Sequence, residues 1–184
     1  MGTIKTTNIE TITGSGTLTL GQSGETITIP SGVTITNNGT QTGFGGTNTP
    51  NFWVYLSTNQ SIPNITFTLV EFNTVVIDTA SAFNTGTYTY TIPSSGKYYF
   101  ASQIRKENFT SNRNLSHLRI NGTTVRDFET GSGSLYGAST GSTIENLSIN
   151  DTVTFYYYQN SGTTNSLRGG GPENTFFCGF KIIE

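Results

Sequence analysis

The sequence predicts an all-β protein. Apolar and polar residues alternate over short runs along most of the chain, which is the period of a half-buried strand and not that of a helix. Charged residues make up only 11% of the composition, while the abundant Thr, Ser, Asn and Gly divide the alternating runs into short segments. With 184 residues, the chain is long enough for one globular core and an appendage. We therefore expect one all-β globular domain with an extension.

Residues 1–48 are predicted to form an N-terminal arm and linker. Short alternating runs lie at 17–21, 26–32 and 33–39, and each offers only two apolar side chains. Strands this short are marginal in water unless another surface covers their apolar side, and three copies winding around a common axis would supply one. The alternative is a loose tail that orders only on docking to a larger assembly. The predicted packing residues of the stem are Leu18, Leu20, Ile27, Ile29, Val33 and Ile35.

Residues 49–184 are predicted to form the head, which begins with a strand over 51–56. Phe52, Val54 and Leu56 would share one face of this strand, and Trp53 and Tyr55 the other. Both faces are apolar, which is typical of a strand that is covered on both sides. A second surface must therefore cover Trp53 and Tyr55, and for Trp53 the linker of its own chain is one candidate.

Further strands are expected downstream. Ile65, Phe67 and Leu69 alternate and predict a strand over 65–72. The stretch 72–100 alternates on both sides of a Pro-Ser-Ser-Gly break, which predicts two strands joined by a tight turn. The glycine-rich residues 132–142 are expected to form a loop.

The run 153–158 is the most informative one for assembly. Val153, Phe155 and Tyr157 would point into the core, which leaves Tyr156 and Tyr158 on the outer face. Tyrosine suits interfaces because its ring packs while its hydroxyl stays hydrated. We predict that Tyr156 and Tyr158 make a subunit contact, with exposed tyrosines on a stable surface as the alternative.

Ten positions carry a resemblance to a known family. An aromatic residue, Asp, two further aromatics, a Gly-x-Tyr-x-Phe run and a closing Phe-x-Gly-Phe occur in step. They resemble the signature of the complement subcomponent globular head, the trimeric jelly roll that is shared with the tumour necrosis factor superfamily. Tyr90 stands where that family usually has Phe, and Ser102 where it has a last aromatic. The matching positions are Phe72, Asp78, Phe83, Tyr90, Gly96, Tyr98, Phe100, Phe177, Gly179 and Phe180.

Two further stretches, 115–128 and 147–155, are similar to other strands of that family. The resemblance covers roughly residues 51–184. It implies a TNF-like jelly-roll β-sandwich that assembles as a homotrimer and has its first strand beside its last, near the base of the trimer. The resemblance therefore implies that Trp53 and Tyr55 contact a neighbouring subunit, with Trp53 packed under the linker of its own chain as the alternative. The runs in 17–39 resemble the β-repeats that phage and other viral fibre proteins place ahead of a globular tip.

Charge and hydropathy exclude several classes of partner. The formal net charge is −2, and no basic cluster is larger than Arg105-Lys106. The electrostatic attraction on which nucleic-acid or anionic-membrane binding depends is therefore missing. No apolar run is long enough to span a membrane, and residues 1–8 do not resemble a signal peptide.

No catalytic, cofactor or metal site is predicted. The single histidine, His117, has no Cys or second His nearby in the sequence and no Gly-x-Ser-x-Gly motif with it. The carboxylates of the head are scattered, and Asp78 and Asp151 are better explained as turn residues. Calcium binding stays open, although no Asp-x-Asp run is present. The single cysteine, Cys178, is expected to be a buried free thiol.

These features predict a structural protein of a virus particle, most simply of a phage, on the exterior of its capsid or tail. The arm would bind other virion proteins, and loops at the far end of the trimeric head would bind a host surface glycan or receptor. One alternative is a soluble trimeric binding module of lectin or cytokine type that is not attached to a particle. Another is a fibre enzyme that degrades polysaccharides.

Overall fold

The computed structural model describes residues 17, 19–36, 38, 48–110, 112–130 and 135–182. The chain divides into two compact units, Met1–Phe44 and Gly45–Glu184. The described residues contain strands and turns but no helix, so the all-β prediction is confirmed. It follows that no described helix is long and apolar enough to cross a membrane.

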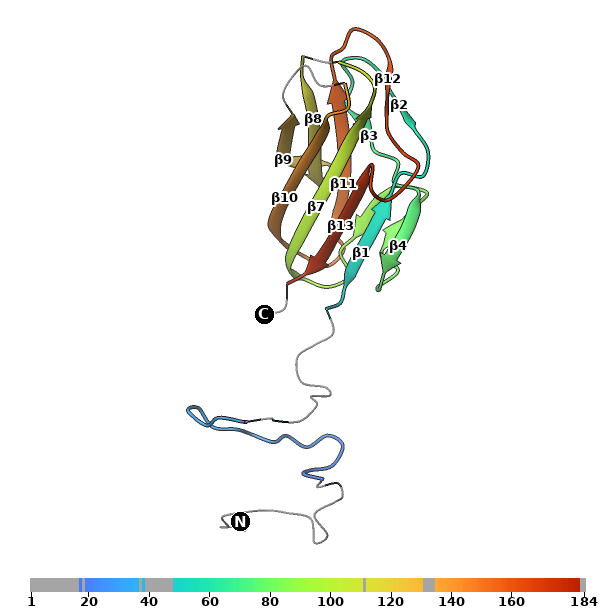
Figure 1. Cartoon of the computed structure of the whole chain (residues 1–184). Helices are drawn as coiled ribbons and strands as arrows, with labels where there is room; N and C mark the ends of the chain where they lie inside the picture. The colour runs from blue at the N-terminus through green and yellow to red at the C-terminus, as the bar shows by residue number, and fades with distance from the viewer. Residues whose placement is uncertain are drawn as a thin grey trace. The chain divides into compact units, whose positions relative to one another are not determined.

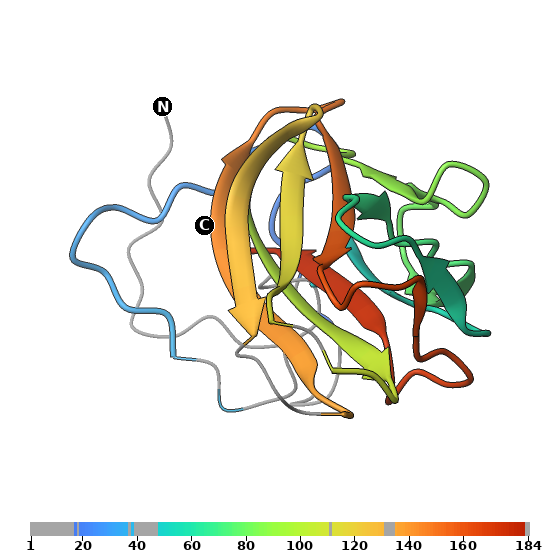
Figure 2. The same ribbon diagram turned by 90° about the horizontal axis from the view of Figure 1, so that it is seen from above.

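The head is a sandwich of two antiparallel sheets (Figures 1 and 2). Sheet 1 has the order β2-β12-β7-β13-β1-β4, and β10 also pairs with β7. Sheet 2 has the order β5-β6-β11-β8-β9, and β3 also pairs with β11. The strands of sheet 1 are β1 (Asn51–Tyr55), β2 (Gln60–Ile62), β4 (Thr74–Asp78), β7 (Gly96–Glu107), β10 (Ala138–Leu147), β12 (Asn165–Leu167) and β13 (Phe176–Lys181). The strands of sheet 2 are β3 (Thr68–Leu69), β5 (Phe83–Asn84), β6 (Thr89–Thr91), β8 (Asn114–Ile120), β9 (Thr123–Thr130) and β11 (Thr152–Gln159).

The core lies between the sheets and is rich in aromatic rings. Buried and half-buried residues alternate along β1, β7 and β11, as the sequence pattern predicts. Phe177 of β13 lies among four other rings, with centroid distances of 4.7 Å to Phe155, 4.8 Å to Phe52, 5.7 Å to Phe100 and 5.9 Å to Phe72. These rings join the two sheets into one hydrophobic core.

The first and last strands of the head are neighbours. β1 pairs with β13 over its whole length, and the Lys181 N–H donates to the Pro50 carbonyl at 3.0 Å. Both strands therefore have an end at the same pole of the sandwich, which we call the basal pole. The turn after β4 also lies there, because the Thr79 N–H donates to the Asn51 carbonyl at 3.0 Å.

The prediction of a strand over 65–72 is largely wrong. Only Thr68 and Leu69 form a strand, because β3 pairs with β11 over two residues alone. Ile65 instead has a φ of 54°, which is rare for a β-branched residue, and its side chain is 65% exposed. Its N–H donates to the Gln159 carbonyl at 2.8 Å, and this bond holds the turn on the end of β11.

The prediction of a loop over 132–142 is wrong for its second half. β10 begins at Ala138 and pairs with β7 as far as Leu147. Gly141 lies in the interior of this strand, where the Phe128 ring packs directly over it. A glycine is needed at this position because an added Cβ would overlap that ring. The glycine therefore marks a close contact between side chain and backbone, and not a turn.

The predicted strands of the arm do not occur among residues 17, 19–36 and 38. This part of the single chain contains turns near residues 23–24 and 31–32, and nothing pairs with its alternating runs. The apolar side chains stay exposed because no second strand covers them. Leu18 lies outside the described residues, and the exposed fractions of the other predicted stem residues are 59% for Leu20, 57% for Ile27, 45% for Ile29, 57% for Val33 and 57% for Ile35.

Candidate functional site

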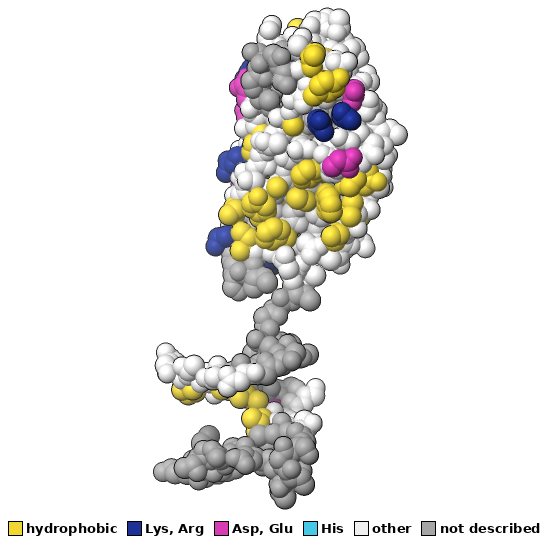
Figure 3. Space-filling view, in the orientation of Figure 1, with side chains coloured by type: hydrophobic (Ala, Val, Ile, Leu, Met, Phe, Trp, Pro, Cys, Tyr) yellow, Lys and Arg dark blue, Asp and Glu magenta, His cyan; other side chains and the backbone are white. Residues whose placement is uncertain are grey.

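Sheet 1 has an exposed apolar outer face, which we call the apolar face (Figure 3). Residues that lie opposite each other in adjacent antiparallel strands point to the same side of a sheet, so the register identifies its members. Cys178 lies opposite Trp53, which lies opposite Ile77, while Tyr99 lies opposite both Phe180 and Ile144. The residues of the apolar face are Trp53, Tyr55, Ile77, Tyr99, Ile144, Phe176, Cys178 and Phe180.

Several of these side chains are open to solvent in the single chain. The exposed fractions are 46% for Ile77, 55% for Ile144 and 36% for Phe180. The rings of Tyr99 and Phe180 pack at a centroid distance of 5.2 Å, which makes the patch continuous from β7 to β13. The apolar face thus contains two of the four predicted interface residues, Trp53 and Tyr55.

The other two, Tyr156 and Tyr158, lie on the opposite side of the head. Their side chains are on the outer face of sheet 2, where Phe67 packs against Tyr158 at a centroid distance of 4.9 Å and against His117 at 4.1 Å. The guanidinium carbon of Arg119 lies 3.9 Å from the centroid of the Tyr156 ring. We call these five residues the aromatic cluster. The four predicted interface residues therefore cannot belong to a single continuous face.

His117 is a structural member of this cluster. Its Nε2 lies 3.1 Å from Oδ1 of Asp127, and its Nδ1 lies 3.3 Å from the Thr124 hydroxyl. Burial lowers the pKa of His117, and Arg119 and Arg113 lower it further, whereas Asp127 opposes the shift. The imidazole is therefore mostly neutral near pH 7 and hydrogen-bonds Asp127 as a neutral donor.

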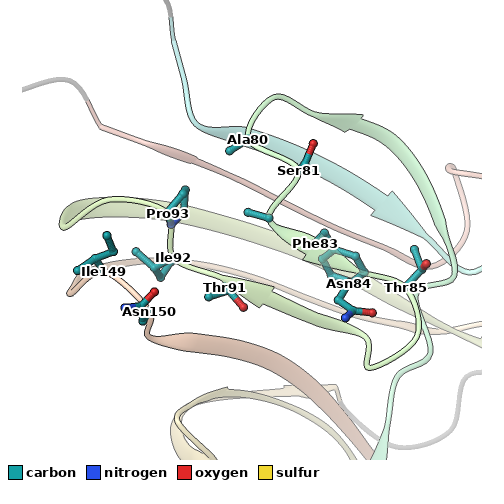
Figure 4. Close-up of a pocket in the computed structure, with 11 residues that line it drawn as sticks. Ala80, Ser81, Phe83, Asn84, Thr85, Thr91, Ile92, Pro93, Ile149 and Asn150 are labelled. Atoms are coloured by element: carbon teal, nitrogen blue, oxygen red, sulfur yellow. The ribbon is translucent and has the colours of Figure 1, made fainter.

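A shallow pocket of about 640 Å³ lies at the basal pole (Figure 4). The turn after β4, strands β5 and β6, and the turn before β11 supply its walls. Ser81, Asn84, Thr91 and Asn150 contribute hydroxyl and amide groups, and Ile149 contributes an apolar surface. No ionisable side chain lines it, so it can donate and accept hydrogen bonds but offers no general acid or base.

The described residues show no arrangement that supports catalysis. No group of three or more His, Cys, Asp and Glu among them is placed to hold a metal ion. His117 is paired with Asp127 and has no serine nucleophile among its contacts. The assignment of a non-enzymatic protein stays a prediction.

Cys178 is free, as expected, but it is not in the core. It belongs to the apolar face and is only half-buried. Its Sγ lies 3.6 Å from the Ala101 carbonyl, and burial raises the pKa of the thiol. The sequence predicts a buried thiol because cysteine often packs as a small apolar residue, but the register places Cys178 on the outer side of sheet 1.

The aromatic residues of the predicted signature, except Phe180, lie in the core. Phe72, Phe83, Tyr90, Tyr98, Phe100 and Phe177 are all buried. Asp78 closes the turn after β4, where its carboxylate accepts the Phe83 N–H at 2.8 Å and the Ala80 N–H at 3.3 Å. Gly96 has a φ of 145°, and Gly179 packs under Phe100. Phe180, in contrast, belongs to the apolar face.

The fold and the apolar face define a jelly-roll β-sandwich of the TNF-like class. The sequence profile of the C1q domain matches residues 51–182, which span most of the chain. The protein therefore belongs to the C1q domain family, and the resemblance drawn from the signature residues is confirmed. No curated protein sequence matches the chain.

Solved structures of similar fold cover almost the whole head. The globular domain of zebrafish complement 1qA protein is 22% identical, with a TM-score of 0.55 over 73% of this chain and 98% of that one. Eiger TNF from S. frugiperda is 12% identical, with a TM-score of 0.58 over 73% of this chain and 92% of that one. Murine APRIL is 16% identical, with a TM-score of 0.51 over 72% of this chain and 99% of that one. At these identities the likeness concerns the fold.

Proposed function

We propose that this protein is a homotrimeric, non-enzymatic binding protein of a virus particle, most simply of a phage. The head self-associates through the apolar face and presents its remaining surface to a host glycan or receptor. The N-terminal arm joins the head to other virion proteins on the capsid or tail exterior. The apolar face is the observation that carries this proposal.

The argument for self-association is the cost of leaving this face in water. Contiguous apolar patches on soluble domains mark interaction sites, and each Å² of apolar surface that is buried contributes about 25 cal/mol. Ile77, Ile144 and Phe180 alone bring three large, partly exposed side chains to the patch. A flat sheet face can pair in a twofold dimer or close a ring, and the family resemblance favours the threefold ring.

Sedimentation velocity on the full chain tests this assembly. Ile144 and Ile149 form a matched pair because they are the same residue type with exposed fractions of 55% and 56%, yet only Ile144 is on the apolar face. The dissociation constant of the trimer should rise at least about tenfold in Ile144→Asp, because a charge would be buried in the subunit contact. The trimer should persist in Ile149→Asp. A wild-type monomer at micromolar concentration, or equal effects of both substitutions, would contradict the proposal.

The arm supports the particle-bound form of this proposal. Leu20, Ile27 and Val33 are all more than half exposed in the single chain, so the arm needs another surface to cover its apolar side chains. Deleting residues 1–40 should leave a folded trimeric head that no longer joins the particle. Cryo-electron microscopy of particles that carry the full or the shortened protein measures this, and normal incorporation of the shortened protein would rule out the anchoring role.

The alternative is a soluble binding module of lectin or cytokine type with the same trimeric head. The observation that favours it is that the C1q domain profile covers residues 51–182 and leaves the arm outside. Full-length protein that occurs free and is absent from purified particles would support this alternative.

A further inference from the structure

We propose that the aromatic cluster on sheet 2 is a binding site for a carboxylate-bearing sugar, with Arg119 as the residue that binds the carboxylate. This inference rests on the proposed function, because it names the ligand class that the outward surface of the head would bind. Ligand recognition would then occur on the outer face of sheet 2, and not in the loops at the far end of the head, where the sequence predicts it.

Arg119 presents an unneutralised guanidinium in a fixed position. No carboxylate among the described residues lies within ion-pair distance of it, whereas Arg113, Arg126 and Arg168 each have one. Its Nε donates to the Thr124 hydroxyl at 3.3 Å, and its guanidinium carbon lies 3.9 Å from the Tyr156 ring centroid and 5.7 Å from that of Phe67. Stacking of this kind restricts the side chain before a ligand arrives, so less rotamer entropy is lost on binding.

The acidic residues around Arg119 already have other partners. Asp127 is bonded to His117 at 3.1 Å, and Glu129 is paired with Arg113 at 3.1 Å. An incoming carboxylate can therefore reach the Arg119 guanidinium without displacing an ion-pair partner. Because the imidazole beside Asp127 is mostly neutral, the carboxylate of Asp127 offsets the charge of Arg119 on this face, so the attraction is short-ranged and depends on direct contact rather than on net charge.

The groups beside Arg119 favour a sugar over an acidic peptide. Thr154 lies directly opposite Arg119 in the register of β11 and β8, and Tyr156 and Tyr158 follow it on the same face. None of these three hydroxyls has a hydrogen-bond partner among the described residues. Phe67 is 36% exposed and adds an aromatic surface beside them. A row of free hydroxyls next to an aromatic ring matches the alternating hydroxyl and C–H surfaces of a sugar.

The site stays accessible in the assembled protein. The aromatic cluster is on the outer face of sheet 2, and the apolar face that we assign to self-association is on the outer face of sheet 1. A trimer would carry three such sites, so weak individual contacts would add up on a surface that displays many acidic sugars.

Binding to immobilised sugars tests the proposal with the full-length protein. The probes are glucuronic acid- and sialic acid-terminated oligosaccharides, their methyl esters, and lactose as a neutral sugar, measured by surface plasmon resonance. The acidic sugars should bind, and esterification should weaken binding at least about tenfold, because the ester removes the charge and keeps the sugar. Equal binding of acid and ester, or no binding of either acidic sugar, would overturn the inference.

Variants then locate the site. Arg119→Gln should lose as much affinity as esterification costs, and Arg119→Lys should recover only part of it because lysine lacks the planar fork. Arg113→Gln is the matched control, since it removes an equal charge from the same face where that charge is already paired with Glu129. Equal losses in Arg119→Gln and Arg113→Gln would mean general charge attraction and would overturn the assignment. Tighter binding of a poly-glutamate peptide than of the sugars would mean a protein partner instead.

Two measurements separate this inference from the proposed function. Thermal melting and sedimentation of Arg119→Gln should match the wild type, and the ester comparison needs no variant at all. Should the trimer bind only neutral sugars, the proposed function would stand while the inference about Arg119 falls. Should the protein be monomeric and bind no surface sugar, both would fall.

Discussion

Replacing Phe177 with alanine should remove the centre of the core. Phe177 is 1% exposed, and its ring contacts the rings of Phe155 and Phe52 at centroid distances of 4.7 and 4.8 Å in edge-on arrangements. Truncation of a buried Phe costs about 3–5 kcal/mol through lost transfer free energy and the cavity that remains. Because both sheets contribute rings to this contact, neither sheet can close the cavity alone, and we expect a value near the upper end.

Urea unfolding of the full chain, monitored by tryptophan fluorescence at several protein concentrations, measures this loss. In a separate thermal unfolding experiment, the melting temperature should fall by roughly 10–20 °C for a head of this size. Phe180→Ala is the matched control from the same strand, because Phe180 is 36% exposed on the apolar face. It should weaken self-association and change the stability of the head much less. A loss below about 1 kcal/mol for Phe177→Ala would refute the placement of β13 in the core.

Three further predictions follow from local contacts. Gly141→Ala should destabilise the head by about 1–3 kcal/mol in urea unfolding, because the added Cβ overlaps the Phe128 ring; an unchanged midpoint would contradict that contact. Burial holds the pKa of His117 below its usual value of about 6.5, so the unfolded chain binds a proton more readily than the folded chain. The unfolding free energy should therefore fall as the pH drops below that usual value, and His117→Gln should remove this pH dependence. Burial raises the pKa of Cys178, so the thiol should react slowly with iodoacetamide near neutral pH and faster in the dissociating variant Ile144→Asp; equal rates would place Cys178 outside the subunit contact.

The sequence predicted which residues of a strand point inward wherever the core covers one face of the alternating run. In 51–56 and 153–158 the sequence assigned inward and outward residues as the structure has them, because burial of one face fixes which residues point inward. The same alternation failed at Ile65, where a backbone bond to Gln159 from a distant strand holds the residue in a left-handed turn. Local pattern has no access to that bond.

The surfaces were harder to predict than the strands. The sequence predicted that both Tyr55 and Tyr156 contact another subunit. However, Tyr55 lies on sheet 1 because its strand pairs with β13, and Tyr156 lies on sheet 2 because its strand pairs with β8. The contact between Arg119 and Tyr156 joins residues from two strands whose register no short motif encodes. From the sequence alone, an arginine in an alternating run is predicted to be an ordinary exposed residue, because its contacts with other strands are not known.

The adjacency of β1 and β13 has a practical consequence for engineering. Since the Lys181 N–H bonds the Pro50 carbonyl, a short tether can join the two ends of the head without crossing either sheet. The head is thus suited to circular permutation, with new termini opened in the connection between β11 and β12, residues 160–164. A reporter domain attached at those termini would stand at the opposite pole, where it would not obstruct whatever the natural ends are joined to.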